Sequence, residues 1–248
     1  MSRFAQTIID ALAETAQGRR VSNVRIGLRY VGIQLDDGSI GVSYNFPEDI
    51  TCDSISFPGQ QRLTNRDAAD VLTWLLSDNQ INRSLALAVA NGLASSRELV
   101  SIGGDIRSVV RISPKDRVVM VGHFETIAND LREFCDLLVY DLKATVGTNL
   151  SGSPKVEESL SKCDVALITA TSIINETAER LINAAMNSRE VVLLGPSTPL
   201  VPEAFADTPV TLLSGVCAVN GEILSVISEG GGMKTFKPYV RKVNCRLK

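Results

Sequence analysis

The chain has 248 residues, of which 44% are hydrophobic and 21% charged, so it has the composition of an ordinary globular protein with room for one large domain or two small ones. Its net charge of -3 at pH 7 gives no reason to expect a nucleic-acid or membrane partner. No apolar run reaches the ~18 residues of a spanning helix, and the polar start of the chain is unlike a signal peptide, so we expect a cytoplasmic location.

Residues 1–96 have the pattern of a small α+β domain. Apolar residues recur at helical spacing first, then alternate as in a β-hairpin, and then return to helical spacing twice. The second of the two later helices is so rich in alanine and leucine that we expect it to be buried on all sides. The predicted elements are a helix over residues 2–17, a hairpin over 21–46 and helices over 66–76 and 81–94.

Asn91 is the polar exception in that last helix, and Gly92 follows it directly. A buried asparagine needs hydrogen-bond partners. Two interpretations remain open: Asn91 caps a neighbouring stretch of backbone, or it points into a ligand cleft.

Residues 97–248 alternate between short apolar strands and helices after a connection with one helical piece at 105–110. This alternation is typical of an open, mostly parallel sheet with helices on both faces, a Rossmann-like α/β domain. The strands are expected at residues 118–121, 137–140, 165–169, 191–194 and either 211–213 or 216–219, and the helices at 125–135, 156–161 and 176–187.

The first strand, glycine turn and helix of this second domain resemble the start of a dinucleotide-binding unit. Asp141 ends the second strand 19 residues beyond Gly122, near the spacing at which an acidic residue meets a ribose. The glycine fingerprint itself is absent, and Glu125 adds negative charge at the helix start where a pyrophosphate would bind. A dinucleotide ligand is therefore disfavoured.

Four strand ends of the predicted sheet carry polar or glycine residues. Ligands of such sheets bind outside the carboxyl ends of the strands, where the strand order reverses. We therefore expect one rim of candidate ligand-binding residues, to which Asn91 could contribute from the first domain. The rim comprises Gly122, His123, Asp141, Thr169, Thr171, Gly195, Pro196, Ser197 and Thr198.

His123 is the single histidine, so any imidazole acid-base step or imidazole metal contact within one chain must use it. The alternative is a histidine that merely caps the turn. Asn175 suits the N-cap of the helix that is expected to begin at Glu176, which would make its side chain structural.

Local spacing does not predict a tightly chelated bare ion, because the chain has no His-x-x-x-His, no Cys-x-x-Cys and no carboxylate cluster of the calcium type. A preformed metal chelate, held by hydroxyls and backbone groups, would need fewer protein ligands. A direct site could arise only through folding. Its candidate ligands are His123 and Asp141, with Glu125 and one of Asp49, Cys52 or Asp53.

Five cysteines without a paired motif indicate reduced, mostly buried side chains and no disulfide framework. They are Cys52, Cys135, Cys163, Cys217 and Cys245. The three glycines at 230–232 precede a basic tail, which is most simply a flexible link to a solvated last segment, although it could also close over an anionic ligand.

Several ordered motifs together resemble a bacterial and archaeal family described as "putative heavy-metal chelation". The resemblance implies an enolase N-terminal-like domain over residues 1–96, a Rossmann-like domain over 97–248, and a site in the cleft between them. Asn91-Gly92 stands where Asn-Ala is expected in the family. The motifs that carry the resemblance are residues 85–93, 119–124, 163–171 with Asn175 and Thr177, 194–199 and 213–216.

Three hypotheses follow. The first is a protein that binds a transition metal or metal chelate, with His123 and Asp141 as metal ligands. The second is an enzyme acting on a small anionic or nucleotide-like metabolite, with His123 as the catalytic acid-base group. The third is an interaction scaffold with an inert rim. Exposed hairpin edges also favour a homodimer.

Overall fold

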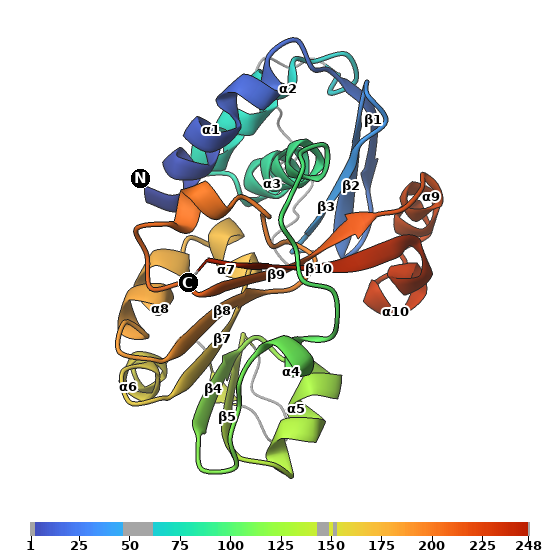
Figure 1. Ribbon diagram of the computed structural model, residues 1–248. Helices are drawn as coiled ribbons and strands as arrows, with labels where there is room; N and C mark the ends of the chain where they lie inside the picture. The colour runs from blue at the N-terminus through green and yellow to red at the C-terminus, as the bar shows by residue number, and fades with distance from the viewer. Residues whose placement is uncertain (1–2, 47–61, 143–148, 151–152, 248) are drawn as a thin grey trace.

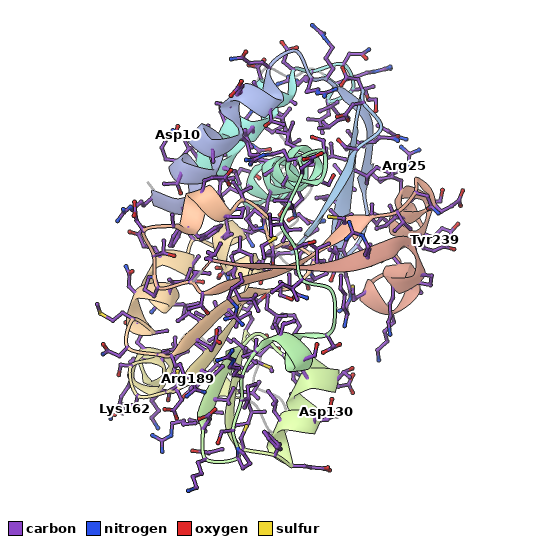
Figure 2. The ribbon with its side chains drawn as sticks, viewed as in Figure 1. Asp10, Arg25, Asp130, Lys162, Arg189 and Tyr239 are labelled. Carbon is purple, nitrogen blue, oxygen red and sulfur yellow. The ribbon has the colours of Figure 1, made fainter. Side chains whose placement is uncertain are left out.

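The structure, a computed structural model, consists of two packed parts (Figure 1). We call residues 3–95 the N-terminal unit and residues 102–247 the C-terminal unit; each is built on its own sheet. Charged side chains such as Asp10, Arg25 and Lys162 point outward (Figure 2). The described residues are 3–46, 62–142, 149–150 and 153–247.

The N-terminal unit places helices against one face of a three-stranded antiparallel sheet in the order β1-β2-β3. The helix α3 lies centrally, and every residue from Ile81 to Ala94 is buried, which confirms that it is enclosed on all sides. The elements are α1 (Arg3–Ala16), β1 (Val21–Ile26), β2 (Tyr30–Leu35), β3 (Ile40–Tyr44), α2 (Ala68–Leu72), the 3-10 helix η2 (Thr73–Leu76) and α3 (Gln80–Ser95).

The predicted hairpin is wrong in one respect, because its first arm is two strands and the sheet is a three-stranded meander. The alternation from Val24 to Tyr30 suggested continuous extension, but the Gly27 N–H donates to the Tyr30 carbonyl at 2.9 Å and closes a turn. A Cβ on Gly27 would lie 2.2 Å from the carbonyl oxygen of Ile227. The turn therefore depends on a residue two hundred positions away that no local pattern reveals.

The C-terminal unit has a seven-stranded sheet in the order β10-β9-β8-β7-β4-β5-β6, parallel except for β10. The chain starts in the middle at β4, runs to one edge, and returns to β7 on the other side of β4. The strand order thus reverses between β4 and β7. The strands are β4 (Arg117–Val121), β5 (Asp136–Asp141), β6 (Asn149–Leu150), β7 (Val165–Thr169), β8 (Glu190–Leu194), β9 (Leu212–Ala218) and β10 (Val240–Arg246).

Helices cover both faces of this sheet, as predicted. Val118 and Met120 of β4 face a core that includes α4 and α5, whereas Val119 and Val121 face the opposite core with α6 and α8. The helices are α4 (Ile106–Val109), α5 (Glu125–Arg132), α6 (Lys155–Leu160), α7 (Thr171–Ile174), α8 (Ala178–Ala184), α9 (Glu222–Ser228) and α10 (Met233–Phe236), with 3-10 turns η3 (Pro202–Phe205) and η4 (Lys237–Tyr239).

The C-terminal segment is not a flexible link, which corrects the sequence-based interpretation. Val240–Arg246 forms the edge strand β10, in which Val243 and Cys245 are buried. A Cβ on Gly231 would lie 2.4 Å from the Val226 side chain, so this glycine serves close packing. The sequence did not reveal this strand, because basic residues interrupt its apolar ones.

The two units are interlocked by the segment between β9 and β10. Its helix α9 packs on β1 and β2, and Ile227 and Phe236 share a core with Ile40 and Val42 of β3. Across the described ranges, no helix combines the length and apolarity needed to cross a bilayer.

Candidate functional site

Gly122 brings the ends of β4 and β7 into contact at the point where the strand order reverses. Its backbone has φ +91°, and a Cβ at this position would lie 2.7 Å from the Thr169 Cβ. Its N–H donates to the Tyr140 carbonyl on β5 at 2.7 Å. The turn that follows β4 therefore fits only glycine and lies directly against the neighbouring strand ends.

Two threonines cap the end of β7 at the same edge. The hydroxyls of Thr169 and Thr171 are hydrogen-bonded to each other at 3.0 Å, and both residues are half-buried. Ser172 donates to the Thr169 carbonyl at 2.6 Å. This bonding fixes the start of α7 while leaving spare acceptor capacity on the threonine pair.

The loop after β8 completes the edge. Gly195 has φ +114°, and its N–H donates to the Ser214 carbonyl at 3.0 Å. A Cβ on Gly195 would lie 3.4 Å from the Phe124 ring, so the loop is in contact with the turn after β4. Thr198 donates its N–H to the Gly195 carbonyl at 3.0 Å. Pro196 is half-buried between them.

His123 and Asp141 lie at the ends of adjacent parallel strands, since Val121 pairs with Tyr140. The His123 side chain is exposed, and the part of the chain that the structure describes offers its imidazole no hydrogen bond. Asp141 accepts the N–H of Leu142 at 2.7 Å. Glu125 faces the Lys234 ammonium of α10 at 3.5 Å instead of a metal partner. The other proposed partners, Asp49, Cys52 and Asp53, lie outside the described residues.

The side chains of Ser197 and Asn91 both form hydrogen bonds with the backbone edge of β3 that has no neighbouring strand. Ser197 Oγ accepts the N–H of Tyr44 at 2.8 Å. Asn91 Nδ2 donates to the Val42 carbonyl at 2.8 Å, whereas its Oδ1 is buried and without a partner. Asn91 therefore caps a neighbouring backbone, which was one of its two interpretations, and retains an unpaired acceptor.

The described residues do not form a direct metal site: they include no group of three or more His, Cys, Asp or Glu side chains placed to hold an ion. The four described cysteines are free, and burial raises the pKa of each thiol, which disfavours the thiolate that a soft metal requires. A donor set for a bare ion is thus lacking in this part of the chain.

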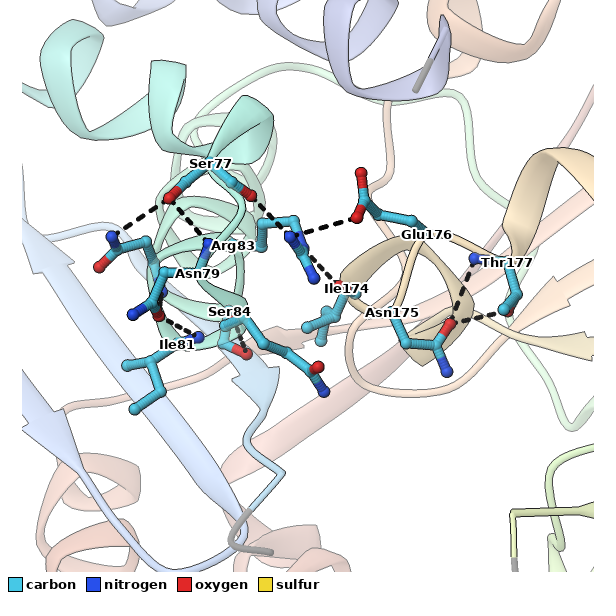
Figure 3. A network of polar contacts seen from close by, with 11 residues as sticks. Ser77, Asn79, Ile81, Arg83, Ser84, Ile174, Asn175, Glu176 and Thr177 are labelled. Carbon is cyan, nitrogen blue, oxygen red and sulfur yellow. Dashed lines mark hydrogen bonds and ion pairs between the residues drawn. The ribbon is translucent and has the colours of Figure 1, made fainter. Parts of the chain in front are cut away.

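Arg83 holds the two units together beside this edge and was not singled out from the sequence (Figure 3). From α3 its guanidinium donates to the Ile174 carbonyl at 2.5 Å and to the Ser77 carbonyl at 2.6 Å, and it faces Glu176 at 3.3 Å. Burial lowers the pKa of this guanidinium. The available signal was an arginine in a helix that the sequence predicts to be buried on all sides.

The segment that Arg83 contacts differs from the predicted helix start. Glu176 has φ +59°, and α8 begins at Ala178. Asn175 is structural, as expected, but its Oδ1 accepts the Thr177 hydroxyl at 2.7 Å in the turn between α7 and α8. A turn with a left-handed residue therefore replaces the expected N-cap.

Comparison with known families identifies the chain. A family model described as "putative heavy-metal chelation" matches residues 105–246, more than half of the chain. The chain belongs to this family. A second family model with the same description matches residues 9–94.

Two solved structures of this family have the same fold. A protein of unknown function from Pyrococcus horikoshii is 20% identical, with a TM-score of 0.86 over 98% of this chain and 99% of that one. Another from Desulfitobacterium hafniense is 21% identical, with a TM-score of 0.79 over 97% and 98%. The comparison with curated proteins finds no significant match. The expected α/β fold, with a small α+β part followed by a Rossmann-like sheet, is confirmed.

Proposed function

We propose that the protein binds a small metal complex at the carboxyl edge of the parallel sheet, on the side that faces β3 and α3. The observation that carries the proposal is the contact of three turns at the strand reversal, where Gly122 meets Thr169 and Phe124 meets Gly195. Open α/β sheets bind their ligands at such a point. The description of the family, "putative heavy-metal chelation", is the reason to propose that the ligand contains a metal.

The donor set favours a complex over a bare ion. A transition metal without its own chelator needs several convergent nitrogen, sulfur or carboxylate ligands, and the described residues hold no such group. They do place the hydroxyls of Thr169 and Thr171 at the end of β7 and the hydroxyl of Thr198 in the loop after β8. Such groups recognise the outer surface of a complex whose inner positions are already filled.

His123 and Asp141 are the two residues of this edge whose side chains could coordinate the metal directly. The exposed imidazole can occupy an open coordination position or accept a hydrogen bond from the complex. Asp141 keeps one carboxylate oxygen beyond the bond to Leu142. Together they add a nitrogen and an oxygen donor from adjacent strand ends.

The test is elemental analysis with native mass spectrometry on freshly purified, untagged protein, because a tag would add histidines. We expect stoichiometric metal or chelate, and at least tenfold less of it in His123→Ala. Glu125→Gln is the matched control, since it alters a neighbouring exposed side chain that is paired with Lys234. Equal metal content in wild type and His123→Ala would remove His123 from the site, and a wild-type protein free of any ligand mass would refute metal-complex binding.

The enzyme hypothesis is the second candidate, and the exposed imidazole of His123 beside the end of β5 favours it. In this case the retained mass would be organic and free of metal. Its turnover would depend on pH, and the His123→Ala variant would lose that dependence. An unchanged pH profile in the variant would exclude this role.

A further inference from the structure

The seam between the two units lies along β3. This strand ends the three-stranded sheet, so one of its backbone edges has no strand beside it. Side chains cover that edge: Asn91 of α3 donates to Val42, and Ser197 of the loop after β8 accepts from Tyr44. Three segments distant in sequence therefore meet within a few residues.

Four buried side-chain oxygens without a hydrogen-bond partner adjoin this seam within the described part of the chain. They belong to residues that are at most 7% exposed, and each is a chain neighbour of Val42, Tyr44 or Ser197 or is bonded to one of them. The oxygens are Ser43 Oγ, Asn45 Oδ1, Asn91 Oδ1 and Thr198 Oγ1.

The identity of the unpaired atoms follows from the bonds that are made. Asn91 directs its amide NH2 to the Val42 carbonyl, and Asn45 directs its own to the Gly27 carbonyl at 3.1 Å. A carbonyl can only accept, so the nitrogen must face it and the amide oxygen must be the free atom. Two of the four unpaired oxygens are therefore pure acceptors.

Leaving such atoms unpaired is costly. A buried polar group without a partner costs about 1–3 kcal/mol, and nearly all such groups in native proteins are paired. Ser43 lies on the same sheet face as Gly41, where a Cβ would clash with the Ala88 carbonyl at 1.9 Å. The backbones of β3 and α3 are already in contact here, so α3 cannot move closer to β3 to pair Ser43 Oγ with Asn91 Oδ1.

We propose that this seam is a subsite for a small hydrogen-bond donor, an amine or coordinated ammine N–H or an O–H, and that it selects donor-bearing ligands over anionic ones. The inference rests on the proposed function and specifies the chemistry of that ligand. Amide oxygens repel the acceptor oxygens of a phosphate or carboxylate, whereas each N–H of an ammine matches one of them. Because the four oxygens are buried, only a small donor group, such as a single N–H or O–H, would pair with them.

Hexaamminecobalt(III) is a suitable probe, because its inert metal has no open position and its surface carries only N–H donors. Hexacyanocobaltate(III) contains the same metal but presents only acceptors. We expect the full-length protein to bind the ammine complex and not the cyanide complex in isothermal titration at 150 mM salt. This salt concentration limits the Debye length to about 8 Å and suppresses non-specific attraction.

The double variant Ser43→Ala/Thr198→Val should bind the ammine complex at least tenfold more weakly. Neither substitution removes a side-chain hydrogen bond among the described residues, so the fold should persist, which a thermal melt would verify. Thr211→Val is the matched control, because its hydroxyl bonds Glu190 at the opposite edge of the sheet. It should leave the affinity unchanged.

Failure of this inference can be separated from failure of the proposed function. Unchanged affinity in the double variant, together with a loss in His123→Ala, would overturn the subsite and retain the metal-complex site. The subsite would also be overturned, and the metal-complex site retained, by either of two results. One is a preference for the cyanide complex; the other is no binding of the ammine complex by a protein that retains metal on purification. A crystal structure of the ammine complex with only water at the four oxygens would also refute the subsite.

Discussion

The parallel sheet has one side formed by the amino ends of its strands, the amino edge, and one formed by their carboxyl ends, the carboxyl edge. Both are polar, but in different ways. The amino edge is charged and held by ion pairs: Asp116 binds Arg189, whose position Figure 2 marks, and Glu190 binds Arg246 at 2.6 Å. The carboxyl edge is mostly neutral, and it leaves Thr198 without a partner in the described chain. Ion pairs therefore hold the amino edge, whereas the carboxyl edge keeps a buried neutral hydroxyl unpaired.

The volume of a hollow does not identify the ligand site any better than charge does. An open hollow of about 560 Å³ lies at the amino edge. Arg189 donates to the Arg111 carbonyl at 3.0 Å and Arg246 to the Val109 carbonyl at 2.5 Å. Because these guanidiniums already bind both a carboxylate and a backbone carbonyl, the hollow offers a ligand little that water does not.

Removal of a charge from the amino edge should have the largest effect on stability. Asp116 is buried and accepts from Arg189 and from the Ser113 N–H, each at 2.7 Å. Asp116→Ala should lower the free energy of unfolding by about 2–4 kcal/mol, because the Ser113 N–H and the Arg189 guanidinium both lose the buried carboxylate that accepts from them. Urea unfolding measures the change.

Asp136→Ala is the control for Asp116→Ala. Asp136 forms an aspartate-arginine pair with Arg117 at the same edge, at 3.1 Å, but both side chains are about half exposed. Exposed pairs contribute less than about 1 kcal/mol. Equal losses in the two variants would show that the amino edge is not held by buried pairing. Ligand binding should be unchanged in both.

Gly122→Ala should have an effect of comparable size, this time at the carboxyl edge. The alanine would have a left-handed backbone, which costs about 1–2 kcal/mol, and would crowd Thr169, which costs about 1–3 kcal/mol more. Gly38→Ala separates the two terms, because Gly38 has φ +86° and no atom within 4 Å of the added Cβ. We expect Gly122→Ala to lose both stability and ligand affinity, and Gly38→Ala to lose only stability.

Acidification should weaken the amino edge. The Arg189 hydrogen bond holds the pKa of Asp116 below its ordinary value. The folded state therefore binds the proton more weakly than the unfolded state. The stabilisation is complete above the unfolded pKa of about 4 and is lost as the pH falls through the lower folded pKa, at about 1.4 kcal/mol per pKa unit.

Asp116→Asn supplies the comparison for that pH dependence. Urea midpoints measured from pH 6 down to pH 3 should fall more steeply in wild type than in the variant. Parallel curves would mean that Asp116 is not responsible for the acid sensitivity of this edge. Ligand affinity, which we attribute to the other edge, should not follow the Asp116 titration.

The fold was predictable because its signals are local. The apolar runs of β4, β7 and β8 and the alanine-rich α3 lie where their patterns indicated. The turn at Gly27 and the strand β10 were missed because the first depends on Ile227 and the second carries basic residues on its exposed face. Tertiary contacts decided both.

The candidate site was predictable only by position. Strand-end chemistry placed Gly122, Thr169 and Gly195 at one edge, and the structure brings their turns into contact. The state of each polar atom was beyond the sequence. The residue types of Asn91 and Thr198 do not indicate whether their side chains are hydrogen-bonded. Only the folded structure shows that Asn91 Oδ1 and Thr198 Oγ1 lack a partner. Arg83 could be noticed in the sequence as a charge in a buried helix, but its partner Ile174 in the other unit could not be predicted.

The smallest expected effect gives the sharpest test of the comparison, because one substitution should act with opposite sign at the two edges. Thr211 donates to Glu190 at 2.7 Å and accepts from the Val191 N–H at 3.1 Å, so Thr211→Val should cost about 1–2 kcal/mol of unfolding free energy. The Thr198 hydroxyl is buried and unpaired, so Thr198→Val should be neutral or stabilise by up to about 1 kcal/mol.

Paired urea titrations of these two valine variants, without added ligand, decide the matter. If Thr198→Val raises the free energy of unfolding and Thr211→Val lowers it, the carboxyl edge sacrifices stability to keep a hydroxyl available, as binding sites commonly do. A loss of equal size at both positions would mean that the Thr198 hydroxyl is already satisfied in the free protein, for example by an ordered water. The unpaired oxygens would then be structural, and the contrast between the two edges would reduce to charge alone.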